Sequence, residues 1–290
     1  MTAGPSLGAQ AHGLAAHLPP LLASAEHLAL AVMPGSHGRR RAGAGDDFWQ
    51  YRAAQPLDSR RLIDHRRSAM GDAEYVRERE WQIAQSVVIW VDPGAAMRFA
   101  SGKGAPTKAG RAQLLALACA ILLIQGGERV GHAGTLAPRR GRAQIAPLAN
   151  ALMDAVPQDH ATLDAAAVPA GSTLILFSDF LGDLEGIRAV VAQSAARGGR
   201  GVLYQILDPA EETFPFQGRT HFESPSGQVR HKTLKASDLR ARYCARLHQR
   251  QETLAGLADR AGWQFGVHRT DRSAQSALLW LYHALAGDRR

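Results

Sequence analysis

Three aspartates follow runs of strand-forming residues, and their placement makes them the first candidates for chemistry in this chain. Asp92 follows residues 86–91, Asp179 follows residues 173–178, and Asp208 follows residues 201–207. The carboxyl ends of parallel strands meet at one edge of a sheet, so we expect the three carboxylates to lie along the same edge. Carboxylates at such an edge can bind a divalent cation.

The residues just after Asp92 argue against a strong metal site. Mg²⁺ takes about six oxygen ligands, but Gly94 and Ala96, two and four residues after Asp92, carry no side-chain oxygen. Asp92 and Asp179 would then face each other without a metal, and the repulsion between their charges would raise the pKa of one of the two carboxyl groups unless another cation lies between them. Arg98 is a candidate for that cation. The favoured alternative is that Asp92 caps its own loop. We therefore expect no cofactor and at most a millimolar Mg²⁺ affinity.

Alternating strand and helix patterns predict the fold that must position these residues. The expected strands are residues 86–91, 128–133, 173–177, 201–207 and 263–267, and the expected helices are residues 108–124, 145–156, 184–196, 234–261 and 273–285. Strands separated by helices are typical of βαβ units. The prediction is an α/β fold with a doubly wound, mostly parallel sheet.

The chain divides into three stretches. Residues 1–38 form an N-terminal segment with an amphipathic helix expected after Pro19 and Pro20. Residues 39–85 are rich in arginine and aromatic residues, and residues 86–290 hold the α/β domain. The arginines of the middle stretch include Arg39, Arg40, Arg41, Arg66 and Arg67. These arginines could bind the phosphates of a nucleic acid, bind an acidic surface of a protein partner, or form ion pairs with the acidic residues of the same stretch. We favour a stretch that is held by internal ion pairs and also offers a surface to a protein partner.

Charge, cysteine content and apolar runs indicate where in the cell the protein resides. The formal charge is +8, and all but four of the basic residues are arginine. Of the two cysteines, Cys119 lies in an apolar helical pattern, so no structural disulfide is expected. Residues 114–124 are the longest strongly apolar run, shorter than the ~20 residues of a spanning helix. We predict a cytoplasmic protein without a membrane partner.

Other chemical motifs are weak. The twelve histidines show no compact ligand spacing with cysteine. The run Gly102-Lys103-Gly104 to Lys108 lacks the spacing of a phosphate-binding loop and is interpreted as the lead into a helix.

Several ordered motifs resemble one known family. Residues 38–52, with Arg-Arg-Arg followed by Asp-Asp-Phe-Trp-Gln-Tyr-Arg, resemble the entry motif of the domain of unknown function 58 proteins. Further matching motifs occur at residues 63–69, 76–78, 128–131, 178–180 and 208–215. The resemblance implies a von Willebrand A-like domain and association with MoxR-type AAA+ ATPases. It also implies a degenerate metal-ion-dependent adhesion site, since the family often has Asp-x-Ser-x-Ser where this chain has Asp92-Pro-Gly-Ala-Ala.

The resulting hypothesis is a non-enzymatic adaptor or co-chaperone that brings a MoxR-type ATPase to an unidentified client protein. The loop of small residues after Asp92 is expected to let Met97, Arg98 and Phe99 project toward the ATPase, with the arginines of residues 39–67 adding long-range attraction. Two alternatives remain open. One is a metal-dependent hydrolase or phosphate-handling enzyme using Asp92 and Asp179, and the other is a nucleic-acid-binding module using the arginine-rich stretch.

Overall fold

The structure is a computed structural model with side chains. It describes residues 21–32, 39–43, 47–55, 63–69, 74–154, 163–223 and 230–286.

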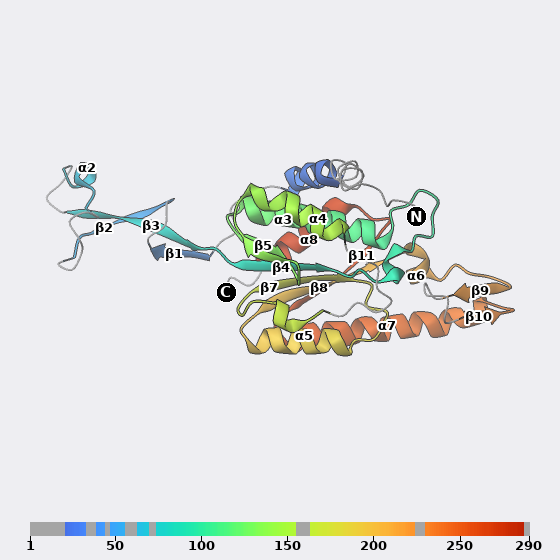
Figure 1. Cartoon of the computed structure of the whole chain (residues 1–290). Helices are drawn as coiled ribbons and strands as arrows, with labels where there is room; N and C mark the ends of the chain where they lie inside the picture. The colour runs from blue at the N-terminus through green and yellow to red at the C-terminus, as the bar shows by residue number, and fades with distance from the viewer. Residues whose placement is uncertain are drawn as a thin grey trace, which may run out of the picture.

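A six-stranded sheet with strand order β11-β8-β7-β4-β5-β6 forms the centre of the molecule (Figure 1). Neighbouring strands pair in parallel except β5 and β6, which pair antiparallel. The strands are β4 (Ser86–Val91), β5 (Arg129–His132), β6 (Leu136–Arg139), β7 (Thr173–Ser178), β8 (Arg200–Leu207) and β11 (Gln264–Arg269). The sequence prediction of a mostly parallel α/β sheet is confirmed.

Helices cover both faces of this sheet. One face packs against the helix Leu21–Val32 and against α3 (Lys108–Gln125), α4 (Ile145–Met153) and α8 (Ala274–Ala286). The other packs against α5 (Glu185–Ala196) and α7 (Ser237–Arg260). Side chains of β4 alternate between the two cores: Val87 and Ile89 enter one, Val88 and Trp90 the other. A strand buried on both faces needs a continuous apolar run, which explains the sequence of β4.

Helix α3 runs through the larger core. Its start is fixed by Thr107, whose side chain accepts a hydrogen bond from the backbone N–H of Gly110 at 3.0 Å. By length and composition alone, the 18 residues of this helix could cross a membrane, although the apolar run at residues 114–124 was too short to predict that. In the structure, 67% of the helix is buried inside the fold.

Two smaller sheets extend from the body in Figure 1. Strands β1 (Arg39–Gly43), β3 (Tyr75–Ile83) and β2 (Asp47–Ala53) form an antiparallel sheet, with the short helix α2 (His65–Ser68) beside β3. Strands β9 (Thr220–Glu223) and β10 (Arg230–Thr233) form a hairpin near the start of α7. Single turns of 3-10 helix, η2 (Ala95–Arg98), η3 (Arg142–Gln144) and η4 (Ala165–Ala167), and the short helix α6 (Pro209–Thr213) complete the elements.

The predicted elements of the α/β body are all present, with ends shifted by a few residues. The predicted helix over 234–261 begins later, at Ser237, and the predicted strand over 263–267 runs from Gln264 to Arg269. The end of the predicted helix over 145–156 lies outside the described residues, and α4 ends at Met153. The helix after the double proline is present as Leu21–Val32. Strands β1, β2, β3, β6, β9 and β10 were not predicted.

Candidate functional site

The three strand-end aspartates lie along one edge of the sheet, as predicted. Strands β4, β7 and β8 are adjacent and parallel, and Asp92, Asp179 and Asp208 follow their carboxyl ends. The chain leaves β4 toward β5 on one side and later returns to β7 on the other, so strand order reverses between β4 and β7. Ligands of open α/β sheets bind in the crevice at such a reversal. Asp92 and Asp179 flank this point.

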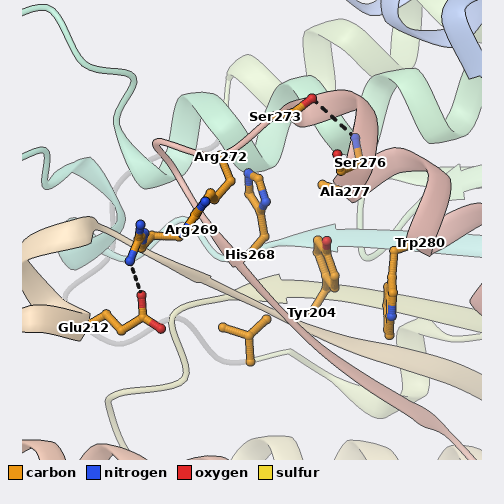
Figure 2. A pocket seen from close by; sticks show the side chains of 10 residues that line it. Tyr204, Glu212, His268, Arg269, Arg272, Ser273, Ser276, Ala277 and Trp280 are labelled. Atoms are coloured by element: carbon orange, nitrogen blue, oxygen red, sulfur yellow. Dashed lines mark hydrogen bonds and ion pairs between the residues drawn. The ribbon is translucent and has the colours of Figure 1, made fainter.

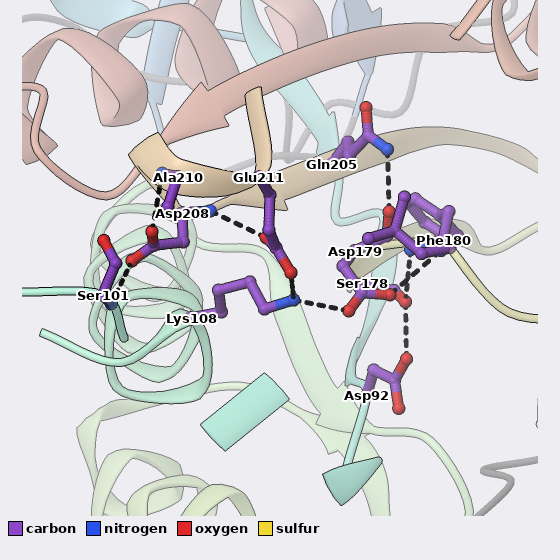
Figure 3. A network of polar contacts seen from close by, with 11 residues as sticks. Asp92, Ser101, Lys108, Ser178, Asp179, Phe180, Gln205, Asp208, Ala210 and Glu211 are labelled. Atoms are coloured by element: carbon purple, nitrogen blue, oxygen red, sulfur yellow. Dashed lines mark hydrogen bonds and ion pairs between the residues drawn. The ribbon is translucent and has the colours of Figure 1, made fainter. Parts of the chain in front are cut away.

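A buried lysine forms ion pairs with two carboxylates at this edge of the sheet (Figure 3). The Nζ atom of Lys108 lies 2.7 Å from Oδ2 of Asp179 and 2.5 Å from Oε1 of Glu211. The lysine side chain is only 1% exposed. Lys108 is the first residue of α3, and its backbone N–H donates to the Phe99 carbonyl at 3.2 Å. The helix start therefore fixes the ammonium beside the ends of β7 and β8.

The pKa values of Lys108 and Glu211 are each shifted by the charge of the other. Burial alone lowers the pKa of Lys108, but the carboxylates of Asp179 and Glu211 outweigh burial, so its pKa lies above the ordinary value. Burial raises the pKa of Glu211, against the opposing effect of Lys108. A buried ion pair is expensive to break, because removing one partner leaves a buried charge without compensation.

Asp92 is held by its own loop and by β7. Its Oδ1 accepts a hydrogen bond from the Gly94 N–H at 2.7 Å, and its Oδ2 accepts one from the Ser178 hydroxyl at 2.5 Å. Burial raises the pKa of Asp92, although these two hydrogen bonds act in the opposite direction. The favoured prediction, that Asp92 caps its loop, is confirmed. Gly94 fits here because a Cβ atom would lie 2.8 Å from Oδ1 of Asp92.

Asp208 links two segments at the same edge. Its carboxylate accepts hydrogen bonds from the Ala210 N–H at 2.8 Å and from the Ser101 N–H at 2.9 Å. Glu211 completes a capping box by accepting from the Asp208 N–H at 2.9 Å. Asp208 therefore fixes the start of α6 and attaches the loop before α3 to it.

The backbone beside Asp179 is unusual. Phe180 has φ of +49°, in the left-handed region that residues with a side chain rarely adopt. Its N–H donates to the Ser178 hydroxyl at 3.0 Å, and the Gln205 amide donates to the Asp179 carbonyl at 2.7 Å. Such conformations persist where surrounding contacts impose them and are frequent at functional sites.

The residues present do not fit a divalent cation. Asp179 already pairs with Lys108, and Asp92 already accepts two hydrogen bonds. Gly94 and Ala96 contribute no side-chain oxygen. Among the described residues, no group of three or more His, Cys, Asp or Glu side chains could hold a metal ion. An ammonium group thus provides the positive charge beside Asp179. It belongs to Lys108 and not to Arg98, which the sequence offered as a candidate.

The loop after Asp92 differs from the expectation at one residue. Met97 is 1% exposed and belongs to the core, so the prediction that it projects is wrong. The 3-10 turn η2 turns Met97 inward, while Arg98 and Phe99 are exposed. Phe99 also lies beside Lys108, whose Nζ is 6.0 Å from the ring centroid.

A small cavity adjoins this loop. Its volume is about 260 Å³, and Phe99, Glu211 and Tyr243 are among its lining residues. Phe214, Phe216 and Phe222 line it as well and stack or cross with ring centroids 5.2–5.6 Å apart. The cavity has the size and lining to accept one large apolar side chain.

The predicted arginine surface is described only in part. Arg39, Arg40 and Arg41 lie in β1, but their side chains are outside the described residues. Arg66 and Arg67 are exposed in α2, and the Arg67 guanidinium lies 5.6 Å from the centroid of the Tyr75 ring. These arginines belong to the small sheet, away from the Asp92 edge (Figure 1).

Lys108 and Glu211 were missed in the sequence analysis. Lys108 was interpreted only as the start of a helix, and Glu211 only as part of a family-like motif. The signal was indirect: a lysine at the first position of an otherwise apolar helix is unusual, because cations are disfavoured at helix N-termini. Such a lysine indicates a local carboxylate partner.

The chain is similar to one protein family and to two solved structures. Residues 50–253 match the family described as "Protein of unknown function DUF58". No curated protein matches the chain. Among solved structures, the conserved hypothetical protein BatB from Bacteroides thetaiotaomicron has 15% identity and a TM-score of 0.44, covering 71% of this chain and 100% of that one. An aerotolerance-related membrane protein from Bacteroides fragilis has 17% identity and a TM-score of 0.44, covering 70% of this chain and 98% of that one.

Proposed function

The chain belongs to the DUF58 family, and from that premise we propose that it is a non-enzymatic protein-interaction module of von Willebrand A-like type. The partner in this proposal is a MoxR-type AAA+ ATPase, to which the chain brings an unidentified client protein. The order β6-β5-β4-β7-β8-β11, with an antiparallel edge strand, supports the fold type. A cytoplasmic location remains part of the proposal.

The main support for a binding role comes from the contacts among the polar groups. The polar groups at the strand-end edge are committed to each other: Lys108 binds Asp179 and Glu211, Ser178 binds Asp92, and backbone amides bind Asp208. A general acid, base or nucleophile must instead reach a substrate. We therefore do not propose the hydrolase alternative. A rigid polar network beneath exposed loops is suited to positioning a docking surface.

The exposed residues above the network suit partner recognition. Arginine and aromatic residues dominate the energetics of protein interfaces when they are centrally buried there. Arg98 and Phe99 are exposed on one loop, and Phe99 borders the cavity of about 260 Å³ that could take a partner's apolar side chain. The proposed docking surface is therefore this loop together with the cavity beside Glu211.

Affinity capture from a native lysate tests the proposal. The immobilised wild-type chain should retain a MoxR-type ATPase in at least one nucleotide state, supplied as ATP, as ADP or as neither. Phe99→Ala should retain much less, because it removes the ring beside the cavity. Arg197→Glu, at the opposite edge of the sheet, is the matched control and should retain as much as wild type. Absence of the ATPase in every nucleotide state would reject the partner.

A further inference from the structure

A second and larger cavity lies at the β11 edge of the sheet (Figure 2). Its volume is about 620 Å³, within the range of small-molecule sites. It is bounded by β8, β11 and the start of α8. Its lining includes Tyr204, His268, Arg272, Ser273, Ser276 and Trp280.

The N-terminal end of α8 opens onto this cavity. Ser273 precedes the helix, and its hydroxyl accepts a long hydrogen bond of 3.5 Å from the Ser276 N–H. The amides of Ser276 and Ala277, which line the cavity, already donate to Ser273, so the helix start offers an anion mainly the positive end of its dipole. Helix α8 spans 13 residues, long enough for this effect.

A buried histidine faces the same space. His268 is 5% exposed, and its Nε2 atom has no hydrogen-bond partner among the described residues. Figure 2 shows the imidazole directed toward the helix start. Burial and the nearby charge of Arg111 lower the pKa of His268 to about 4, so the ring is neutral near pH 7. Buried polar atoms normally have partners, so this one points to a missing polar ligand.

The charges of the lining select an anion. Arg269 is already bound to Glu212 at 2.8 Å and to Asp271 at 2.6 Å. Arg272 lines the cavity and also lies near Asp271, whose pKa is lowered mainly by Arg269 and to a smaller extent by Arg272. Arginine next to helix amides is well suited to phosphate, because its planar guanidinium can donate two hydrogen bonds at once.

The opposite wall is aromatic. Trp280 stacks on Tyr204, with ring centroids 5.1 Å apart and planes 21° apart, and Tyr204 stacks on His268 with centroids 6.4 Å apart. Gly266 of β11 leaves room for this arrangement, since a Cβ atom there would lie 2.5 Å from the Trp280 ring. Aromatic side chains in a cavity offer a surface on which a planar ring can stack.

We propose that this cavity binds a small organic phosphate that carries a planar ring, of the size of a mononucleotide. The phosphate contacts Arg272 and the Ser276 hydroxyl at the start of α8, His268 Nε2 bonds a polar atom of the ligand, and the planar ring packs beside Trp280. This site is separate from the proposed docking surface and does not depend on it.

Calorimetric titration of the full chain tests the site, with AMP and UMP as probes. Both should bind saturably, whereas adenosine and inorganic phosphate, which each carry half of the chemistry, should bind more weakly. Arg272→Gln should weaken AMP binding by about tenfold or more. Arg197→Gln, at the far edge of the sheet, should bind AMP like wild type. Circular dichroism establishes that both variants are folded.

A second readout locates the ligand. In a ¹⁵N spectrum, the indole N–H signal of Trp280, assigned through Trp280→Phe, should shift with AMP in proportion to saturation. No saturable binding of either nucleotide at millimolar concentration would overturn the proposal. Equal affinity of wild type and Arg272→Gln would overturn the site, and phosphate binding as tightly as AMP would overturn the role of the ring.

Discussion

At the scale of single residues, Lys108 is the main determinant of the candidate site. Its ammonium lies between Asp179 and Glu211, 2.7 Å and 2.5 Å from their carboxylate oxygens. An internal ammonium gives a constant positive charge without any dependence on free metal.

Removal of this ammonium should destabilise the fold. Lys108→Met leaves the buried Asp179 carboxylate and the partly buried Glu211 carboxylate without a cation, and we expect a loss of about 3–5 kcal/mol in the free energy of unfolding at pH 8. The exposed Lys103→Met is the control and should change stability little. Urea denaturation measures both, and a loss below about 1 kcal/mol for Lys108→Met would show that the pair is unimportant.

The same variant should show a defined pH dependence. Burial already raises the pKa of Glu211, and without Lys108 nothing of comparable charge opposes it. Folded Glu211 then binds a proton at pH values where the unfolded chain does not, so stability rises as pH falls. The difference between Lys108→Met and wild type should therefore shrink between pH 8 and pH 5. An equal difference at both pH values would contradict this assignment.

Magnesium should have little effect on the wild-type chain. We expect no saturable gain in melting temperature below millimolar Mg²⁺, because stabilisation follows the ratio of ligand concentration to dissociation constant. The double variant Gly94→Ser, Ala96→Ser should not restore binding, since Lys108 remains and a Cβ at residue 94 displaces Asp92. Thermal melting with increasing Mg²⁺ checks both, and a saturable shift at micromolar metal in either protein would refute the account.

At the scale of elements, the strands and helices of the body could be predicted because their patterns are strong. Central strands such as β4 are buried on both faces and need uninterrupted apolar residues, which makes them visible in the sequence. The edge strand β6 was missed because it is short and only half buried, and it contains Pro138. The Lys108 network could not be predicted, since it joins residues 71 and 103 positions apart.

The short helix α6 should be a point of coupling between the elements. Asp208→Ala removes the acceptor for both Ala210 and Ser101, so we expect a loss of about 1–3 kcal/mol. Hydrogen exchange at the Ser101 amide should accelerate more than at other amides of its loop. Asp164→Ala is the matched control, because Asp164 caps only the short turn η4. Unchanged protection at Ser101 would show that Asp208 does not attach this loop.

At the scale of the whole molecule, the two proposed partner surfaces lie at opposite ends of β4. The small sheet with Arg39, Arg40 and Arg41 continues through β3 into the start of β4, whereas Asp92 and its loop follow the end of β4 (Figure 1). Charges act only over about 10 Å at ordinary salt. The arginines can therefore attract only the part of a partner that comes close to the small sheet, not the part that contacts the Asp92 loop.

Neutralising Arg39, Arg40 and Arg41 to glutamine should therefore change association kinetics more than dissociation. We expect a slower association rate with the ATPase and a weaker dependence of that rate on salt, with the dissociation rate unchanged. Surface plasmon resonance at two salt concentrations measures these rates. A changed dissociation rate alone would assign the arginines to the contact itself.

Docking of a MoxR-type ATPase on the loop after Asp92 can be measured with the purified ATPase. Equilibrium binding of the purified ATPase should be measured by surface plasmon resonance for wild type, Arg98→Glu and the control Arg197→Glu, in each nucleotide state. We predict that Arg98→Glu weakens binding by about tenfold or more, as expected for a central interface arginine, while Arg197→Glu binds like wild type. Equal binding by Arg98→Glu and wild type would contradict the proposed surface, and no binding by wild type would contradict the partner.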